Sequence, residues 1–341
     1  MKDVPIVLSM GDCCGIGPEI IAKLFKHTAE NPRFLVLGDV AVMRRAVLQA
    51  RLPLGIAPTI AQVESPTERV PDGCMAVMQV PGLPMGLVDL PVGQVHAHAG
   101  AAAAACVELG ANLCLQGDAV ALVTAPLNKA AMSAAGIRYP GHTEMLQALC
   151  TTAQGMPPVR MMLANPQLRT VLVTIHVSVR HAIDLITLDN VLKTIQITHE
   201  AAQRWGLPAP RIAVAGLNPH AGEEGLFGDE EILHIAPAIR AAQALGIDAR
   251  GPIAPDTVFM RARHTAEHPG EFDVVVAMTH DHGLIPVKYL GVEQGVNVTL
   301  GLPFVRTSPD HGTAFDIAGQ GMADESSLRA SVQMARTLVA Q

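Results

Sequence analysis

Three histidines each follow a strand-like apolar segment of this sequence within a few residues. The segments and their histidines are 169–175 with His176, 211–217 with His220, and 272–278 with His280. Ligands of an open parallel sheet bind outside the carboxyl ends of its strands, so we expect the three imidazoles at one edge of such a sheet. Three histidines with open coordination positions are typical of a catalytic metal site. The alternative is that each histidine only caps or hydrogen-bonds its own loop.

A glycine-rich turn, Gly11 to Pro18, follows a strand-like segment and opens a helix. The amino end of a helix can hold an anion. However, the glycines at positions 11, 15 and 17 do not form a dinucleotide-binding fingerprint, and the Gly-Lys-Ser/Thr of a P-loop is absent. A tight strand-to-helix turn explains the motif equally well.

Two further segments could bind an anion. His142 and Thr143 precede an apolar helical stretch, where Thr143 is expected as the N-cap and would leave amides free. Lys288, Asn297 and Arg306 follow the third histidine, and cations there suit a carboxylate or phosphate. The alternative for these cations is an ordinary solvated surface.

Composition limits the function classes. The 341 residues favour about two domains, and 49% apolar with 16% charged residues can bury a large core, which excludes wholesale disorder. A net charge of −7 and only 3% aromatic residues argue against a nucleic-acid partner.

The six cysteines form no C-x-x-C pair, so the sequence contains neither a zinc ribbon nor a thioredoxin motif. Reduced thiols fit a cytoplasmic protein. The first residues lack the pattern of a signal peptide, and the alanine run 97–105 is too short to span a bilayer. We therefore expect a cytoplasmic protein that contacts no membrane.

The elements that must position these residues alternate along the chain. Strands are expected at 4–10, 34–37, 119–124, 169–175, 211–217 and 272–278, and helices from Pro18 and at 97–115, 188–205, 229–245 and 326–340. Residues 51–95 are rich in Pro and Gly and show no periodicity. Continuous apolar strands separated by helices indicate an α/β fold with mostly parallel sheets covered on both faces.

Longer motifs carry a family resemblance. They are GDCCGIGPEI (11–20), TAPLNKAAM (124–132), GHTE (141–144), GLNPHAGEEGLFGDEEI (216–232), APDT (254–257), THDHGLIPVK (279–288) and GVNVTLGLPFVRTSPDHGTAFDIAG (295–319). Over nearly its whole length the chain resembles the 4-hydroxythreonine-4-phosphate dehydrogenases of vitamin B6 (pyridoxine) biosynthesis. It resembles still more their paralogues of sugar-acid catabolism, the D-threonate and D-erythronate 4-phosphate dehydrogenases.

The resemblance implies a two-domain fold like that of isocitrate and isopropylmalate dehydrogenases, with the active site in the interdomain cleft of a homodimer. The domains would be 1–135 plus 305–341, and 136–304. His176, His220 and His280 would bind a divalent metal, zinc or else cobalt, magnesium, manganese or nickel, with His280 coming from the partner subunit. The implied substrate-binding residues are His142, Thr143, Lys288, Asn297 and Arg306. NAD or NADP would bind near His311, Gly312, Thr313 and Asp316.

The implied reaction is oxidation of the secondary hydroxyl β to a carboxylate in a phosphorylated four-carbon acid, followed by decarboxylation. The sequence leaves 4-hydroxythreonine 4-phosphate, D-threonate 4-phosphate and D-erythronate 4-phosphate open as substrates. Lys129, Asp256 and Asp281 are the candidates for the general base. Two alternatives remain: a cis-dihydrodiol dicarboxylate dehydrogenase of the terephthalate type, and a metal-dependent hydrolase that binds no NAD.

Two positions depart from the family pattern. Cys13-Cys14 replaces the usual Pro-Ala, and His282 stands where a Gln is common, beside His280. Neither change removes an implied ligand, but His282 could add one.

Overall fold

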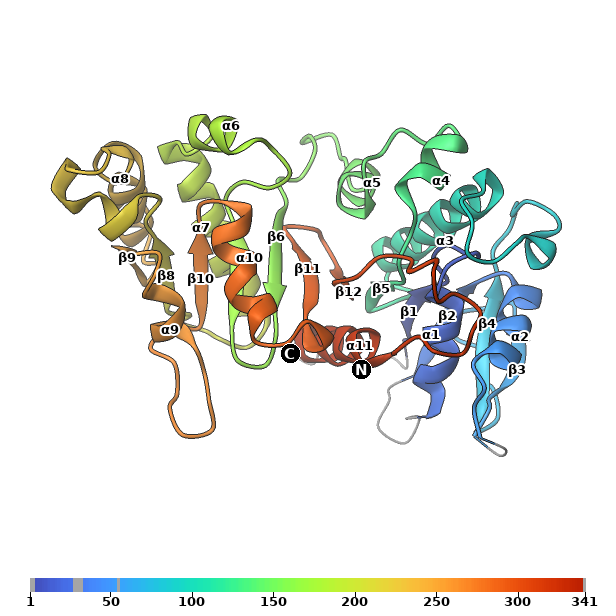
Figure 1. The fold of residues 1–341 in the computed structure, drawn as a ribbon. Coiled ribbons are helices and arrows are strands. Elements are labelled where there is room, and N and C mark those ends of the chain that lie inside the picture. The colour runs from blue at the N-terminus through green and yellow to red at the C-terminus, as the bar shows by residue number, and fades with distance from the viewer. Residues whose placement is uncertain (1–3, 27–32, 54–55, 340–341) are drawn as a thin grey trace. The chain divides into compact units, whose positions relative to one another are not determined.

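The computed structural model describes residues 4–26, 33–53 and 56–339, which form two compact units (Figure 1). Unit 1 contains the described residues up to 157 together with 302–339, and unit 2 contains 158–301. The expected division placed 136–157 in the second domain. These residues belong to unit 1 because helix α5 (His142–Leu149) packs against α3 (Ala97–Gln116).

The sheet of unit 1 is parallel at each described pairing. Its strand order is β3-β4-β2-β1-β5-β12. The strands are β1 (Ile6–Ser9), β2 (Phe34–Gly38), β3 (Thr59–Val63), β4 (Cys74–Gln79), β5 (Ala121–Thr124) and β12 (Val305–Pro309). The strands β1, β2 and β5 are buried along their whole length, as expected for parallel strands covered on both faces.

Helices cover both faces of this sheet. Besides α3 and α5 they are α1 (Gly17–Leu24), α2 (Val40–Gln49), α4 (Lys129–Ala134) and α11 (Ser326–Val339), with a short 3₁₀ turn η2 (Leu87–Asp89). Leu122 lies against Gly110 of α3, whereas the Thr307 hydroxyl donates to the Ser331 carbonyl of α11. Thr307 pairs with Val123, the neighbour of Leu122, and successive side chains of a strand alternate between faces. Helices α3 and α11 therefore lie on opposite faces.

The sheet of unit 2 is mixed. Its order is β11-β6-β7-β10-β8-β9, and β6 is antiparallel to both neighbours while the remaining pairings are parallel. The strands are β6 (Arg160–Ala164), β7 (Arg169–Leu172), β8 (Ile212–Ala215), β9 (Ala249–Ile253), β10 (Val274–Ala277) and β11 (Val296–Leu300). The α/β class with mostly parallel strands is confirmed.

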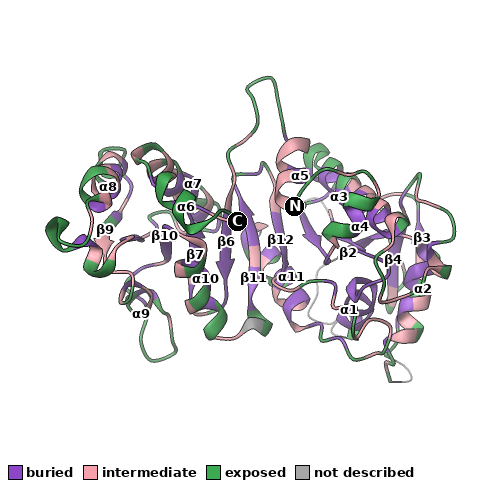
Figure 2. Ribbon diagram, turned by 45° about the horizontal axis from the view of Figure 1, so that its top comes forward, coloured by how far each residue is buried: buried purple, intermediate pink, exposed green. Residues whose placement is uncertain are grey.

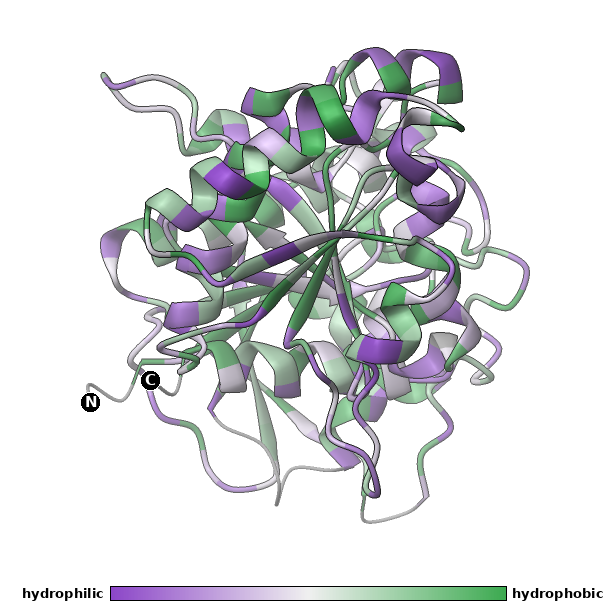
Figure 3. Cartoon of the chain, turned by 90° about the vertical axis from the view of Figure 1, so that its left-hand side faces the viewer, coloured by the Kyte–Doolittle hydropathy of each residue, from purple (hydrophilic) through white to green (hydrophobic). Residues whose placement is uncertain are grey.

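Two cores flank the sheet of unit 2. Ile212, Val214 and Val276 pack in one cluster, while the alternating residues Ala213 and Val275 pack in the other. The helices are α6 (Val179–Asp184), α7 (Leu188–Arg204), α8 (Ala236–Ala244), α9 (Val258–Ala262) and α10 (His280–Tyr289), with short turns η3 (Pro219–Gly225), η4 (Glu231–Ile235) and η5 (Val292–Gln294). Figures 2 and 3 show buried, hydrophobic strands between helices whose outer faces are exposed and hydrophilic.

The expected elements compare closely with the observed ones, with differences at their ends. Each expected strand overlaps an observed one: β2 extends one residue past its expected end, to Gly38, and the other five observed strands are shorter than expected. The expected helix at 229–245 starts instead as a π-helical turn at Glu231 and continues as α8, so the anticipated N-cap Asp229 lies outside it. The expected last residue of the final helix, Ala340, lies outside the described residues. Strands β3 and β4 occupy the segment 51–95, which the sequence left unassigned.

Helix α3 is the one helix, among the described residues, that is long and apolar enough to cross a membrane. Most of it is buried, and it packs on β1, β2 and β5. It is therefore a core helix of unit 1. A Cβ at Gly100 of this helix would lie only 2.2 Å from the carbonyl carbon and oxygen of Ala131 in α4. The glycine allows the two helix backbones to touch.

We predict that Gly100→Ala destabilises the protein. Alanine favours a helix by about 1 kcal/mol over glycine, but overpacking against a fixed backbone typically costs about 1–3 kcal/mol or more. Urea unfolding should give a net loss of stability. Leu115→Ala, at an exposed position of the same helix, is the matched control and should change stability by less than about 0.5 kcal/mol. An unchanged unfolding midpoint for Gly100→Ala would show that α3 and α4 can separate without cost.

Candidate functional site

The segment that carries His176 continues the pairing of β7 and β10 beyond the strands. The amide of Val173 donates to the Ala277 carbonyl at 2.9 Å, and the Thr174 hydroxyl donates to the Met278 carbonyl at 2.8 Å. Both segments thus leave the sheet side by side, and His176 and His280 follow two residues later. Their ring centroids lie 5.8 Å apart. The two strand ends therefore bring these two imidazoles close together within a single chain.

His220 lies in a strained turn. Five successive residues, 220–224, have positive φ values between 43° and 81°, and only one of them is glycine. A left-handed conformation costs about 1–2 kcal/mol for each non-glycine residue, so the surrounding structure must hold this turn in place. The ring of His220 lies 6.1 Å from that of Phe227.

Glu231 holds the entrance of this turn. Its buried carboxylate accepts the amides of Leu217 and Asn218 at 2.7 and 2.8 Å through Oε1, and the Asn218 side-chain amide at 2.9 Å through Oε2. Asn218 also donates to Glu230 at 2.6 Å. Hydrogen bonds to a charged acceptor are among the stronger ones, so this clamp can offset the strain. Sequence reasoning missed Glu231, although it stands inside the 216–232 motif.

His280 is the first residue of α10, and its Nδ1 lies 2.8 Å from the Asp281 carboxylate. A carboxylate only accepts, so this contact assigns the Nδ1 proton and leaves Nε2 as the lone-pair nitrogen. Helix α10 lies very close to β7: a Cβ at Gly283 would be 2.3 Å from Leu172 Cδ2, and Gly283 O accepts the Thr170 hydroxyl at 2.9 Å.

Two adjoining cavities of unit 2 are lined by the histidines. One, of about 480 Å³, is lined by His176 and His280, and the other, of about 610 Å³, is lined by His220. Leu217, Asp281 and His282 line both. Two candidate general bases, Asp256 and Asp281, share the larger cavity with His220. The sequence-predicted residues of this edge are therefore neighbours in space.

The three histidines do not close a metal site by themselves in the single chain. Within the described ranges, the one group of three His, Cys, Asp or Glu side chains with ligand atoms within 4.8 Å of one another is Asp12, Cys13 and Cys14. A single chain is not expected to close the histidine set, because the resemblance takes His280 from a partner. One further donor is available: His282 Nδ1 is buried and has no hydrogen-bond partner among the described residues.

Unit 1 holds a second group of the predicted residues. Arg306 on β12 is buried, and its Nη2 donates to the Thr124 hydroxyl at 2.7 Å, at the carboxyl end of β5. Burial lowers the pKa of Arg306 to about 10, partly countered by Glu144. Burial, and then the charges of Arg306 and Lys129, lower the pKa of His142 well below its usual value. The imidazole of His142 is therefore neutral at neutral pH beside a permanent cation.

The start of α5 differs from the expectation. Gly141 is the N-cap, without a side-chain cap bond, and His142 begins the helix. Thr143 therefore lies in the first turn and is not the cap, because the extended backbone ends two residues earlier than expected. Lys129 begins α4, with its Cε 3.8 Å from where a Cβ of Gly141 would lie. The first turn of α5 thus faces one candidate base.

The backbone amides of the glycine-rich turn donate to acceptors within the protein. Cys14 N donates to Asp12 Oδ1 at 2.9 Å, Gly15 N donates to the Asp12 carbonyl at 3.0 Å, and Ile16 N donates to the Thr313 carbonyl at 3.0 Å. This supports a tight strand-to-helix turn over an anion cradle. Burial raises the pKa of the Asp12 carboxyl to about 6, against the lowering effect of the Cys14 amide.

Thr313 lies in the loop 311–316, which the resemblance assigns to the dinucleotide. His311 Nδ1 contacts the Gly312 carbonyl at 3.0 Å, and a Cβ at Gly312 would meet no atom within 4 Å. The Asp316 carbonyl accepts from Gln320 at 2.7 Å. The loop is therefore held at Thr313 and open at Gly312.

Lys288 and Asn297 belong to unit 2 and line neither histidine cavity. Lys288 is exposed in the last turn of α10, and Asn297 lies on β11 with Oδ1 buried and unbonded among the described residues. The predicted substrate residues are thus divided between the units, with His142, Thr143 and Arg306 in unit 1.

Comparison with known proteins identifies the family. Residues 30–335 match the family described as pyridoxal phosphate biosynthetic protein PdxA. The chain is 51% identical to a 4-hydroxythreonine-4-phosphate dehydrogenase of Beijerinckia indica over 340 residues, which are 99% of this chain and 96% of that protein. The chain belongs to the PdxA family.

Other PdxA relatives carry a second activity name. A D-threonate 4-phosphate dehydrogenase of Cupriavidus necator is 46% identical over 330 residues, covering 95% of this chain and 94% of that protein. The crystal structure of a 4-hydroxythreonine-4-phosphate dehydrogenase from Klebsiella pneumoniae superposes with a TM-score of 0.87 at 41% identity, covering 100% of this chain and 99% of that one. The prediction that this protein is an oxidoreductase of the PdxA family is confirmed.

We predict that His142 makes stability depend on pH. Unfolded His142 binds a proton below its ordinary pKa of 6.5, whereas the folded protein keeps it neutral, so stability falls as pH drops below about 6.5. Urea unfolding of wild type and His142→Asn between about pH 5 and 8 measures this effect. The difference in stability between the two proteins should shrink or reverse toward low pH. Parallel curves would contradict a neutral His142.

Proposed function

We propose that this PdxA-family dehydrogenase oxidises the secondary hydroxyl β to the carboxylate of a phosphorylated four-carbon acid, with NAD or NADP as hydride acceptor and subsequent loss of CO2. The observation that carries the proposal is the similarity of the chain, at 46–51% identity, to relatives named for such substrates, together with three histidines that line adjoining cavities. 4-Hydroxythreonine 4-phosphate and D-threonate or D-erythronate 4-phosphate are the candidate substrates.

We infer that His176, His220 and His280 hold a divalent cation, with zinc the first candidate and cobalt, nickel, manganese and magnesium the others. The donor set fits: Asp281 orients His280 so that its Nε2 carries the lone pair, and two further imidazoles lie at neighbouring strand ends. When bound, such a cation lowers the pKa of the substrate hydroxyl and stabilises the alkoxide that forms.

We infer that the anionic ends of the substrate bind the residues that the resemblance implies. In unit 1, Arg306 supplies a permanent positive charge, and neutral His142 can donate one hydrogen bond without adding a second charge. Thr143 offers a hydroxyl, and Lys288 and Asn297 complete the set from unit 2. Holding both ends of a substrate in this way can lower the barrier by several kcal/mol, as in other enzymes that orient their substrates.

The proton of the hydroxyl needs an acceptor. Asp281 is engaged with His280, which favours an orienting role for it, whereas Asp256 lines the cavity of His220 and is exposed to it. Lys129, near the first turn of α5, remains the third candidate. These contacts support Asp256 as the acceptor, acting directly or through one water.

A second copy of the chain would complete the site. Two exposed apolar side chains line the cavity of His220, with Ile285 64% and Tyr289 90% exposed. Such a patch marks an association surface. It supports a homodimer that shares the site, in a reducing cytoplasm consistent with six free cysteines.

The reaction is tested directly with an NADH-formation assay. The protein is incubated with NAD or NADP, each candidate cation, and the three acid phosphates, with the unphosphorylated acids as controls. We expect turnover with at least one phosphorylated acid and little with its unphosphorylated control, because the cationic anchors lose their target. No reduction with any acid phosphate, but turnover of a cyclic cis-dihydrodiol dicarboxylate, would favour the terephthalate-type reaction instead.

His220→Ala should lose bound metal and activity together, because the remaining imidazoles cannot hold the cation alone. Metal content after dialysis and the NADH-formation rate measure the two losses. His268→Ala, at an exposed loop position outside both cavities, is the control and should keep both. Full activity in His220→Ala would remove this histidine from the proposed metal site.

A further inference from the structure

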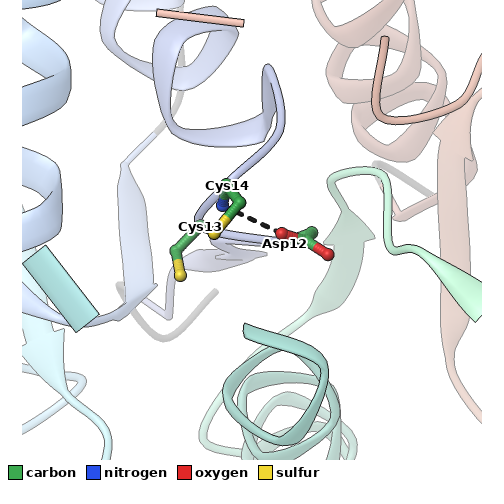
Figure 4. A group of neighbouring side chains, drawn as sticks. All are labelled: Asp12, Cys13 and Cys14. Carbon is green, nitrogen blue, oxygen red and sulfur yellow. Dashed lines mark hydrogen bonds between the residues drawn. The ribbon is translucent and has the colours of Figure 1, made fainter. Parts of the chain in front are cut away.

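A second cluster of metal-ligating side chains lies in unit 1, at the carboxyl end of β1. Ligand atoms of Asp12, Cys13 and Cys14 all lie within 4.8 Å of one another. Figure 4 shows the two sulfur atoms next to each other, with Asp12 beside them and bonded to the Cys14 amide. The histidines discussed above belong to unit 2, so this cluster shares no residue with that site.

The cluster is buried, and one of its donors has nothing to bind. The relative exposure of Asp12 and Cys14 is 0%, and that of Cys13 is 1%. Asp12 Oδ1 accepts from Cys14 N, but Oδ2 has no hydrogen-bond partner among the described residues. In Figure 4 Oδ1 faces the two sulfur atoms and Oδ2 points away from them, so a cation at the cluster would be held through Oδ1.

The backbone around the cluster is already fixed. Asp12 N donates to the Pro126 carbonyl at 2.9 Å, and Gly93 N donates to the Cys14 carbonyl at 2.7 Å. Arg45 donates from Nη2 to the Cys13 carbonyl at 2.7 Å and from Nη1 to the Val88 carbonyl at 2.6 Å. The three donor side chains are therefore presented by a turn that needs little rearrangement to bind an ion.

The donor chemistry selects a class of ion. Two thiolates with one carboxylate suit a soft or borderline divalent cation of the zinc class, and they suit magnesium or calcium poorly. Three protein ligands leave one position of a tetrahedron open. The charges also balance: two thiolates and a carboxylate carry −3, the ion adds +2, and the guanidinium of Arg45, which donates to the Cys13 carbonyl from α2, adds +1.

We propose that Asp12, Cys13 and Cys14 form a binding site for a thiophilic divalent cation of the zinc class. Binding replaces the two thiol protons by the ion, so it releases protons and strengthens with pH. The ion would fix the turn whose next amide, Ile16 N, donates to the Thr313 carbonyl. The site would thereby stiffen the support of the loop 311–316.

Cadmium is the probe, because cadmium thiolates absorb in the ultraviolet and cadmium bound only by histidine and carboxylate does not. The full chain is reduced with a phosphine, stripped with a chelator and titrated with Cd²⁺. We expect a thiolate-to-cadmium band that saturates at one ion per chain, whatever cadmium the histidines bind. No band at saturating Cd²⁺ would overturn the proposal.

Substitutions test which residues produce the absorption band. Cys13→Pro with Cys14→Ala, the pair common in the family, should abolish it. Cys114→Ala, which removes a buried thiol near Cys150, should leave it unchanged. Loss of an outer-shell partner alone typically weakens metal binding by about 10–100-fold, so Asp12→Asn should weaken it by at least about tenfold. A band that survives in the double variant, or vanishes in Cys114→Ala, would overturn the assignment.

Circular dichroism checks that each variant is folded. If the double variant does not fold, X-ray absorption at the cadmium edge of the wild-type and Cys114→Ala proteins decides. A shell with two sulfur atoms in both proteins supports the site, and a shell of nitrogen and oxygen alone overturns it.

Discussion

The buried carboxylate of Glu231 is the contact on which the histidine edge depends. It binds two backbone amides and one side-chain amide at the entrance of a turn whose residues 220–224 have left-handed backbone. Without that clamp the turn would relax toward right-handed conformations, which cost less. The imidazole of His220 would then leave the cavity it shares with Asp256 and Asp281. The backbone strain is confined to residues 220–224, and three hydrogen bonds to the Glu231 carboxylate offset it.

In unit 1, burial influences the protonation of two predicted substrate-binding residues, His142 and Arg306. Arg306 keeps its positive charge inside the protein, and its presence helps to keep His142 neutral. A protonated His142 would be repelled by Arg306 and Lys129, which adds to the effect of burial in favouring the neutral imidazole. The hydroxyl of Thr124 orients the guanidinium. The electrostatics of this group therefore come from a few contacts between α5, β5 and β12.

Part of the site could be predicted from the sequence, because an apolar run followed by a histidine indicates both a buried strand and a polar side chain at its carboxyl end. The segments before His176 and His280 both form such strands.

The clamp by Glu231 could not be predicted, since nothing in an acidic stretch of sequence indicates that one glutamate is buried against backbone amides. Edge strands were also missed: β3 and β9 are partly exposed, and β9 contains Gly251-Pro252. The short run Arg160–Ala164 gives no information on direction, so the antiparallel β6 was unforeseen. Adjacent cysteines were visible in the sequence, but the unbonded oxygen of Asp12 was not.

The contact between Gly283 and Leu172 links two histidines mechanically. Because α10 rests directly on β7 there, the helix that begins with His280 cannot shift without moving the strand that leads to His176. A movement of α10 would therefore be passed to β7 and would shift the two segments that carry these imidazoles together. A larger residue at position 283 would then change the spacing of the two rings through the packing of the helix on the strand.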